Sequence, residues 1–419
     1  MTPDARTDRI DPATSERLSV ARVLCILGMI WVHVPGGAAD AAGRTFLAAD
    51  PAGTLQAFLI ETMGRSSAAL LSVVSGWLCA RTLLGGRGAG ALVRARARTI
   101  LVPMLTWALA TVAVYGLVSL VRPTFLSVAG PVDARALLFW ANNVLFLTEA
   151  PHGPTMHLAF LRDLFVCACL APLLLRALGR RPGLLLTGLG LLYVADLESP
   201  LMLRPLVLFA FVAGMWLARA RIRIDVADRG LWLWIALALG SSAAVVLANG
   251  GAFETFGARL EAVGLDLHES VLYPVSRLFG SLAVWTLTAR LSGTRAARAL
   301  AGQMPWLFTT YCSHFLVLGV LWVGLLEPLG LGGSPVTFTA WFLVAPLVAL
   351  LVGRTIVRLT LAGWPRGAGL LGLRRPATDA GFRPRTAAAV LAGEAVGDAA
   401  AGRPALGGGP ERTTAPAEV

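Results

Sequence analysis

The sequence predicts an all-α fold: a polytopic membrane helix bundle of about ten transmembrane helices with both termini in the cytoplasm. Of the 419 residues, 56% are hydrophobic and only 14% are charged, and the mean hydropathy is +0.70. Water-soluble globular chains contain roughly 25% charged residues. This excess of apolar residues excludes a soluble enzyme, a disordered chain and a disulfide scaffold, and it predicts a chain that resides in the bilayer.

Ten apolar segments are long enough, or nearly long enough, to cross a bilayer as a helix, which takes about 20 residues. They cover approximately 17–35, 56–80, 99–121, 156–176, 183–197, 202–218, 230–249, 271–289, 304–326 and 337–359. The segment 183–197 is the shortest of the ten. A further apolar stretch at 136–147 has only about 12 residues, which favours an interfacial or re-entrant position in an outer loop.

The arginines predict how these spans are oriented. The chain contains 36 basic residues, all of them Arg, and its formal net charge is +12. With the N-terminus inside, 28 arginines fall on the inner side, and the six on the outer side are Arg44, Arg122, Arg135, Arg204, Arg259 and Arg277. Short cytoplasmic loops carry such an excess of Lys and Arg. The basic charge therefore predicts a multi-pass protein of the cytoplasmic (inner) membrane and needs no nucleic-acid partner.

The pattern divides the chain into three parts: a cytoplasmic N-terminal segment at 1–16, a transmembrane domain at 17–360 and a cytoplasmic tail at 361–419. The tail is rich in Ala, Gly, Pro and Thr and has no sustained apolar period, so we expect it to be largely disordered. The first span shares a basic start and an apolar run with cleavable signal peptides. Its length and the nine spans after it favour a permanent membrane segment.

Polar residues inside the first two spans are candidates for function, because an ionisable group in a bilayer is costly unless it is paired or faces a wet cavity. Arg22 and His33 are eleven residues apart, which places them on one helix face with about 16.5 Å between them along the axis. Glu61 and Arg65 form an i,i+4 pair that could neutralise itself. Ser75 precedes a glycine, and small residues of this kind also permit close helix packing.

Two later spans carry similar groups. His157 opens the fourth span and is followed by the adjacent Arg162 and Asp163. Tyr311 and His314 share a face of the ninth span. Each of these residues could also serve only to join neighbouring helices, which is the structural alternative.

These motifs, in this order, resemble the acyltransferase 3 family of multi-pass membrane O-acyltransferases. The resemblance covers about 17–360, and the matching pieces are Arg22 and His33 with ten residues between them, Ser75-Gly76, the arginine-rich stretch Arg94 to Pro103, the string His157 to Leu164, and Tyr311 with His314. The chain departs from the family pattern at Ala159, where Trp is usual, and in the Leu and Val residues before Ser75, where Phe is usual. These departures bear on the shape of the acceptor pocket.

The resemblance implies transfer of an acyl group, commonly acetyl, from a cytoplasmic acyl-CoA to a hydroxyl of a glycan, a lipid-linked sugar or another acceptor. An imidazole can take the hydroxyl proton or carry the acyl group, and we expect His33 in one of these roles. Donor phosphates suit guanidinium groups. The candidates for the donor site are Arg22, Arg94, Arg96 and Arg98. We expect acyl-CoA as a co-substrate, no tightly bound cofactor and no metal.

The remaining candidates have supporting roles. Arg162 or Arg65 would stabilise the developing oxyanion, and Asp163 would orient a partner. His314 would relay or position a proton together with Tyr311. Acceptor contacts are expected from Arg65, Ser75, His157 and Tyr311.

A transporter or flippase without acyl chemistry is the competing interpretation, because intramembrane His, Arg and Asp also mark proton-coupled pathways. Two features argue against it: no internal repeat is visible, and no Gly/Pro-broken spans are placed symmetrically. The expected partners of the enzyme are the lipid bilayer, acyl-CoA and a hydroxyl acceptor.

Overall fold

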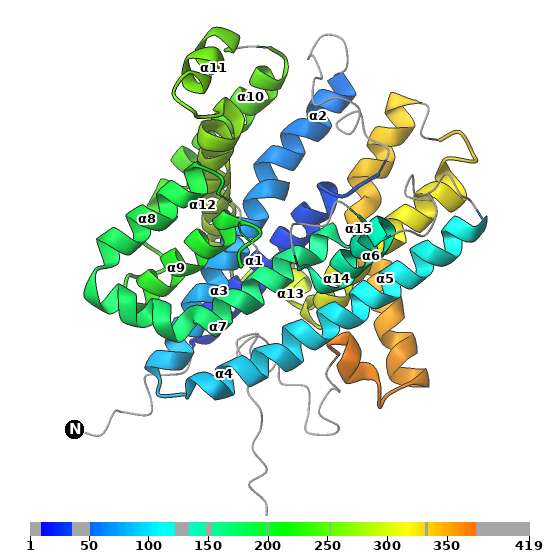
Figure 1. Cartoon of the computed structure of the whole chain (residues 1–419), viewed down its shortest axis with the longest axis horizontal. Helices are drawn as coiled ribbons and strands as arrows, with labels where there is room; N and C mark the ends of the chain where they lie inside the picture. The colour runs from blue at the N-terminus through cyan, green and yellow to red at the C-terminus, as the bar shows by residue number, and fades with distance from the viewer. Residues whose placement is uncertain are drawn as a thin grey trace, which may run out of the picture.

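The computed structural model describes residues 10–35, 51–121, 134–147, 153–197, 199, 201–251, 253–331 and 334–373. Within these ranges the chain is helical and has no β-strand, which confirms the all-α class (Figure 1). The longer helices are α1 (Pro12–Trp31), α3 (Ser66–Leu84), α5 (Val102–Val121), α6 (Ala134–Leu145), α7 (Ala159–Arg180), α8 (Pro182–Val194), α9 (Pro205–Arg219), α10 (Leu231–Asn249), α12 (Tyr273–Leu291), α14 (Met304–Leu321) and α15 (Pro335–Gly363).

Shorter helical pieces join or extend these helices. The α-helical ones are α2 (Pro51–Leu59), α4 (Ala89–Arg96), α11 (Glu254–Glu261) and α13 (Arg295–Ala301). Four π-helical segments are η2 (Ile60–Arg65), η3 (Ala97–Leu101), η7 (Leu267–Leu272) and η8 (Trp322–Leu326). The 3₁₀ segments are η5 (Met156–Leu158), η6 (Asp228–Gly230) and η9 (Ala368–Leu371). Since π-helical turns are rare and often lie at functional sites, the position of η2 is informative.

Six helical segments of the described chain are long and apolar enough to cross a membrane: Pro51–Leu84, Ala89–Ser119, Met156–Arg180, Asp228–Asn249, Met304–Leu326 and Pro335–Gly363. Two shorter apolar helices, α8 and α9, lie where two further spans are predicted. At the last two predicted positions, α1 and α12 have 20 and 19 residues but are more polar. The bundle is thus a multi-pass one, while the count of ten and the cytoplasmic position of both termini stay predictions.

The polarity of α1 has a structural cause, because this helix lies inside the protein. It contacts α3 and α12 on one side and α14 and α15 on the other (Figure 1). Its polar side chains Arg17, Ser19 and Arg22 are therefore buried against protein rather than lipid. The helix that carries the first sequence motif is a central element of the bundle.

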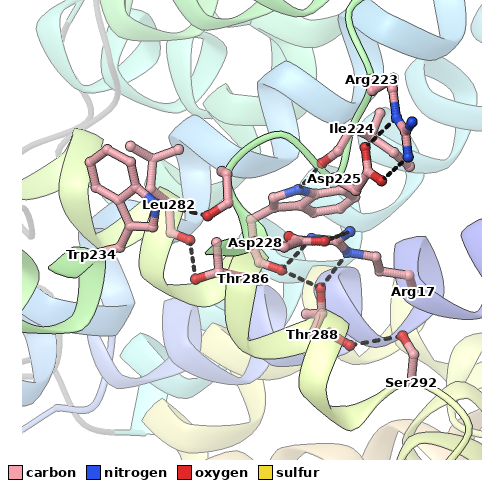
Figure 2. Close-up of polar contacts among 12 residues, drawn as sticks. Arg17, Arg223, Ile224, Asp225, Asp228, Trp234, Leu282, Thr286, Thr288 and Ser292 are labelled. Carbon is pink, nitrogen blue, oxygen red and sulfur yellow. Dashed lines mark hydrogen bonds and ion pairs between the residues drawn. The ribbon is translucent and has the colours of Figure 1, made fainter. Parts of the chain in front are cut away.

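A network around Arg17 fixes the start of α1 (Figure 2). The Arg17 guanidinium donates to both carboxylate oxygens of Asp228 at 2.9 and 2.6 Å, to Thr288 Oγ1 at 3.2 Å and to the Trp285 carbonyl at 3.0 Å. It also lies 3.9 Å from the centroid of the Trp285 ring. These contacts join α1 to α12 and to the connection between α9 and α10, so they set the axial position of everything that α1 carries.

Two glycines allow α3 and α9 to cross with their backbones in contact. A Cβ on Gly76 would come within 1.9 Å of the Phe211 carbonyl oxygen, and a Cβ on Gly214 within 2.0 Å of the Val73 carbonyl oxygen. Close approach of this kind is how small residues join helices in membranes. The Ser75-Gly76 step therefore has a packing role at Gly76.

Candidate active site

Three histidines that are far apart in the sequence come together in the bundle. His33 follows α1 by two residues, His157 lies in η5, and His314 lies in the middle of α14. The ring centroids are 5.4 Å apart for His33 and His314, 4.7 Å for His157 and His314, and 6.0 Å for His33 and His157. The structure thus joins three of the motifs that the sequence singles out.

Two aromatic residues of α14 hold this group of rings. Phe315 stacks on His157 with centroids 5.5 Å apart and packs edge-on against His33 at 5.7 Å. The Tyr311 hydroxyl donates a hydrogen bond to the carbonyl oxygen of His157. Tyr311, His157 and His314 are all buried, with exposed fractions of 2%, 1% and 0%. These three side chains are thus enclosed by protein.

The buried histidines are held in defined tautomers. His157 Nε2 lies 3.1 Å from the Cys312 carbonyl, and His314 Nδ1 lies 2.5 Å from the Tyr311 carbonyl. Because a carbonyl only accepts, each of these nitrogens carries the hydrogen. In the neutral rings His157 Nδ1 and His314 Nε2 then have bare lone pairs, and neither has a hydrogen-bond partner among the described atoms. The site therefore contains two unused proton acceptors.

His33 differs from the other two rings because it is partly exposed. Its ring makes no hydrogen bond with a residue of the described part of the chain. His33 is thus the least buried of the three histidines, and its ring contacts those of His157 and His314.

Arg162 and Asp163 shape the wall of the site. Arg162 Nη1 lies 2.9 Å from Asp163 Oδ1 and donates to the Leu201 carbonyl at 2.7 Å, and the Leu203 amide donates to the same carboxylate oxygen at 3.3 Å. The pair thereby ties the start of α7 to the segment before α9. These contacts give both residues a positioning role.

Arg204 immediately precedes α9 and lies close to His157. The sequence predicts it only as an arginine of an outer loop. Its Nη2 donates to the Met156 carbonyl at 2.9 Å, next to His157. It lies close enough for its charge to act on His33, His157 and Tyr311. Tyr115 of α5, whose hydroxyl donates to the Phe315 carbonyl at 3.4 Å, is another residue that no sequence motif marked.

The predicted pair of Glu61 and Arg65 is present in η2, with 2.8 Å between Arg65 Nε and Glu61 Oε1. This segment packs on the C-terminal end of α1, where Gly64 lies directly against Val32. Arg65 is 35% exposed in its side chain and close enough for its charge to act on His33. A partly exposed cation that is paired with Glu61 therefore lies within electrostatic range of His33.

The predicted donor arginines separate into buried and exposed groups. Arg22 and Arg96 are each 2% exposed and lie near enough for their like charges to repel, whereas Arg94 and Arg98 are exposed. Arg96 Nη2 donates to Cys79 Sγ at 3.3 Å and forms no ion pair with an acidic residue of the described chain. Arg22 and Arg96 are thus the two interior members of the predicted donor set.

Ser75, like Arg94 and Arg98, lies apart from the group of histidines. It is half-buried on α3 beside the α9 contact and makes no hydrogen bond with a described residue. Among the described residues, no group of His, Cys, Asp or Glu has an arrangement that could hold a metal ion.

This combination defines a class of protein: a multi-pass membrane helix bundle with an interior imidazole site and buried cations on the same central helix. The family model described as an acyltransferase domain, that of the acyltransferase 3 family, matches residues 15–360. The chain belongs to this family and is a membrane acyltransferase.

One relative supports this assignment over nearly the whole chain. The chain is 27% identical over 384 residues to the succinoglycan biosynthesis protein ExoH of Rhizobium meliloti (strain 1021), a match that covers 90% of this chain and 100% of the relative. No solved structure matches.

Proposed function

We propose that the protein transfers an acyl group, acetyl in the simplest case, from a cytoplasmic acyl-CoA to a hydroxyl of a glycan, a lipid-linked sugar or a similar acceptor at the inner membrane. Family membership supports acyl transfer. The name of the relative, a protein of succinoglycan biosynthesis, supports a glycan acceptor. The observation that carries the proposal is the contact of the partly exposed His33 with two buried imidazoles. Each of these two rings has one nitrogen without a hydrogen-bond partner among the described atoms.

In the reaction we propose, His33 takes the proton of the acceptor hydroxyl while that oxygen attacks the thioester carbonyl carbon. The carbon–sulfur bond then breaks, and the leaving thiolate takes the proton from His33. His314 orients His33, because its centroid distance of 5.4 Å allows a small rotation to bring an N–H of His33 onto the bare Nε2. A base oriented by a second acceptor is the arrangement of known acyl-transfer triads.

Charge develops on the carbonyl oxygen during this attack, and a cation nearby lowers the barrier. We assign this role to Arg65, because its side chain stays 35% exposed in the ion pair with Glu61 and its charge acts on His33. Arg162, the other sequence candidate, is engaged with Asp163 and Leu201 and acts by holding the segment that carries Arg204.

The donor phosphates are assigned to Arg22 and Arg96 on the cytoplasmic half of the bundle. Arg22 and His33 are about 16.5 Å apart along α1 if the helical rise is maintained. An extended pantetheine arm can follow this path and present the thioester at His33. Arg94 and Arg98 are exposed and contribute only long-range attraction.

The test is acyl transfer from radiolabelled acetyl-CoA to an acceptor glycan extract by membranes that contain the protein. His33→Ala should lower the rate about 1000-fold. His268→Ala, a histidine outside the site, should leave it unchanged. Equal rates for wild type and His33→Ala, with a substrate still carried across the membrane, would support the transporter interpretation and overturn the proposal.

A second arm tests the donor site. Arg96→Gln should raise the KM for acyl-CoA about tenfold or more, because a charge-assisted hydrogen bond contributes about 1.5–3 kcal/mol. The matched variants Arg94→Gln and Arg98→Gln, on the exposed face of the same segment, should change the KM less than threefold. Equal effects of all three substitutions would contradict the interior path.

A further inference from the structure

An open cavity lies at the other end of α7 from the histidines. Its volume is about 380 Å³, and it opens between the ends of α3, α7 and α9. The length of α7 puts it about 30 Å from the start of that helix, where His157 lies. Neither the acyl-transfer chemistry nor the predicted donor path uses this cavity.

The floor and the rim of the cavity differ in character. Leu83, Pro172 and Leu175 make up the apolar part of the lining, which we call the floor. The rim carries the guanidinium groups of Arg176, Arg180 and Arg219, all three exposed. None of these three arginines forms an ion pair with an acidic residue in the part of the chain that the structure describes. Three guanidinium groups therefore surround the apolar part of the cavity, and all three can bind an anion.

Gly179 opens the space for one of these cations. A Cβ at this position would come within 2.9 Å of Arg219 Nη2, so the guanidinium of Arg219 lies directly over the backbone of α7. Pro172, one to two turns earlier, interrupts the helix hydrogen bonding on the same helix. The absence of a side chain at Gly179 thus allows the Arg219 side chain of α9 to lie across α7.

The surroundings of the cavity are apolar and open. Leu173 on α7 is 60% exposed and Leu184 on α8 is 67% exposed. In a multi-pass bundle such leucines face lipid tails, which places the arginine rim at the level of the headgroups. The arginines of this rim belong to the side that the charge pattern predicts to be cytoplasmic.

We propose that this cavity binds the phosphate headgroup of an anionic phospholipid of the inner leaflet. The arginine guanidinium groups would donate paired hydrogen bonds to the phosphate oxygens. The leucines and the proline of the floor would contact the part of an acyl chain next to the headgroup. An apolar floor continuous with lipid-facing leucines favours a lipid over a soluble phosphate compound. This proposal is independent of the proposed acyl transfer.

The test is lipid binding by the full-length protein in a neutral detergent, followed by native mass spectrometry and by thermal melting with added phosphatidylglycerol. Wild type should retain phosphatidylglycerol over phosphatidylcholine. The triple variant Arg176→Gln, Arg180→Gln and Arg219→Gln should bind it about 100-fold more weakly. Gly179→Leu, which fills the cavity and keeps all charges, should also lose the bound lipid.

A matched control removes the same charge from exposed arginines elsewhere on the predicted cytoplasmic side, with the substitutions Arg181→Gln, Arg221→Gln and Arg295→Gln. This variant should keep wild-type lipid binding, and all variants should melt alike without lipid. Equal loss in the control, or equal retention of phosphatidylcholine, would overturn the proposal. Displacement of the lipid by equimolar coenzyme A or inorganic phosphate would assign the cavity to soluble phosphates and overturn it as well.

Discussion

Individual nitrogen atoms decide what the three-histidine site can do. His314 donates through Nδ1 to a carbonyl of its own helix and leaves Nε2 bare, whereas His157 donates through Nε2 and leaves Nδ1 bare. The side-chain amide of Asn can donate the hydrogen bond that His314 Nδ1 donates. The amide of the longer Gln can donate the one that His157 Nε2 donates. Each substitution therefore keeps the anchoring hydrogen bond and removes only the bare lone pair.

His314→Asn should accordingly keep the melting temperature and lower kcat about 100-fold, because it removes the group that orients the base. The limb of the pH–rate profile that belongs to His33 should also move, because His33 loses the acceptor that orients it. His157→Gln should keep stability in the same way, with a smaller loss of kcat. Unchanged kcat in both variants, with the fold intact, would show that the buried histidines only pack.

Several residues of this site could be predicted from the sequence, and the others show what the sequence lacks. His33, His157, Tyr311 and His314 stand out because polar groups inside apolar spans are costly. Arg204 could not be recognised, since it lies at the end of a span and resembles any outer-loop arginine. Only the fold shows that the loop before α9 folds back over the start of α7.

Close contacts between helices fix the relative positions of the elements that carry the site. Gly76→Ala should lower the stability of the bundle by about 3 kcal/mol, because the new Cβ would meet a backbone carbonyl that cannot move away. Gly116→Ala on α5, where nothing lies within 4 Å of the added atom, should be neutral or stabilising by about 1 kcal/mol. Thermal melting in detergent measures both, and equal melting would contradict the close crossing of α3 and α9.

The anchoring of α1 at Arg17 can be tested in the same way. Arg17→Gln should cost about 3 kcal/mol, because it leaves the Asp228 carboxylate without its buried partner. Arg223→Gln breaks the neighbouring ion pair of Figure 2, whose side chains are 83% and 45% exposed, and should leave the melting temperature unchanged. If both variants melt alike, the network does not hold α1.

The existence of most helices could be predicted from apolar length, and their local geometry could not. The π-helical segments depend on tertiary contacts, such as those of η2 with α1 and α12, which no sequence period reveals. Likewise α1 is less apolar than the other spans because protein, rather than lipid, surrounds much of its surface.

In the whole molecule, a pair of buried cations, Arg22 of α1 and Arg96 of α4, and the imidazole site around His33 lie toward opposite ends of α1. Such an arrangement suits an enzyme whose donor and acceptor arrive from opposite sides. Arg22 and Arg96 belong to the predicted cytoplasmic half, and His33 lies near the predicted outer end of α1. The orientation itself rests on the arginine distribution.

The most direct test of this account uses sealed, right-side-out vesicles that contain the protein, with radiolabelled acyl-CoA enclosed inside and an impermeant glycan acceptor outside. The wild type and His268→Ala should label the outer glycan, and His33→Ala should not. Label that appears only when donor and acceptor are on the same side, or labelling by His33→Ala at the wild-type rate, would contradict acyl transfer through this site.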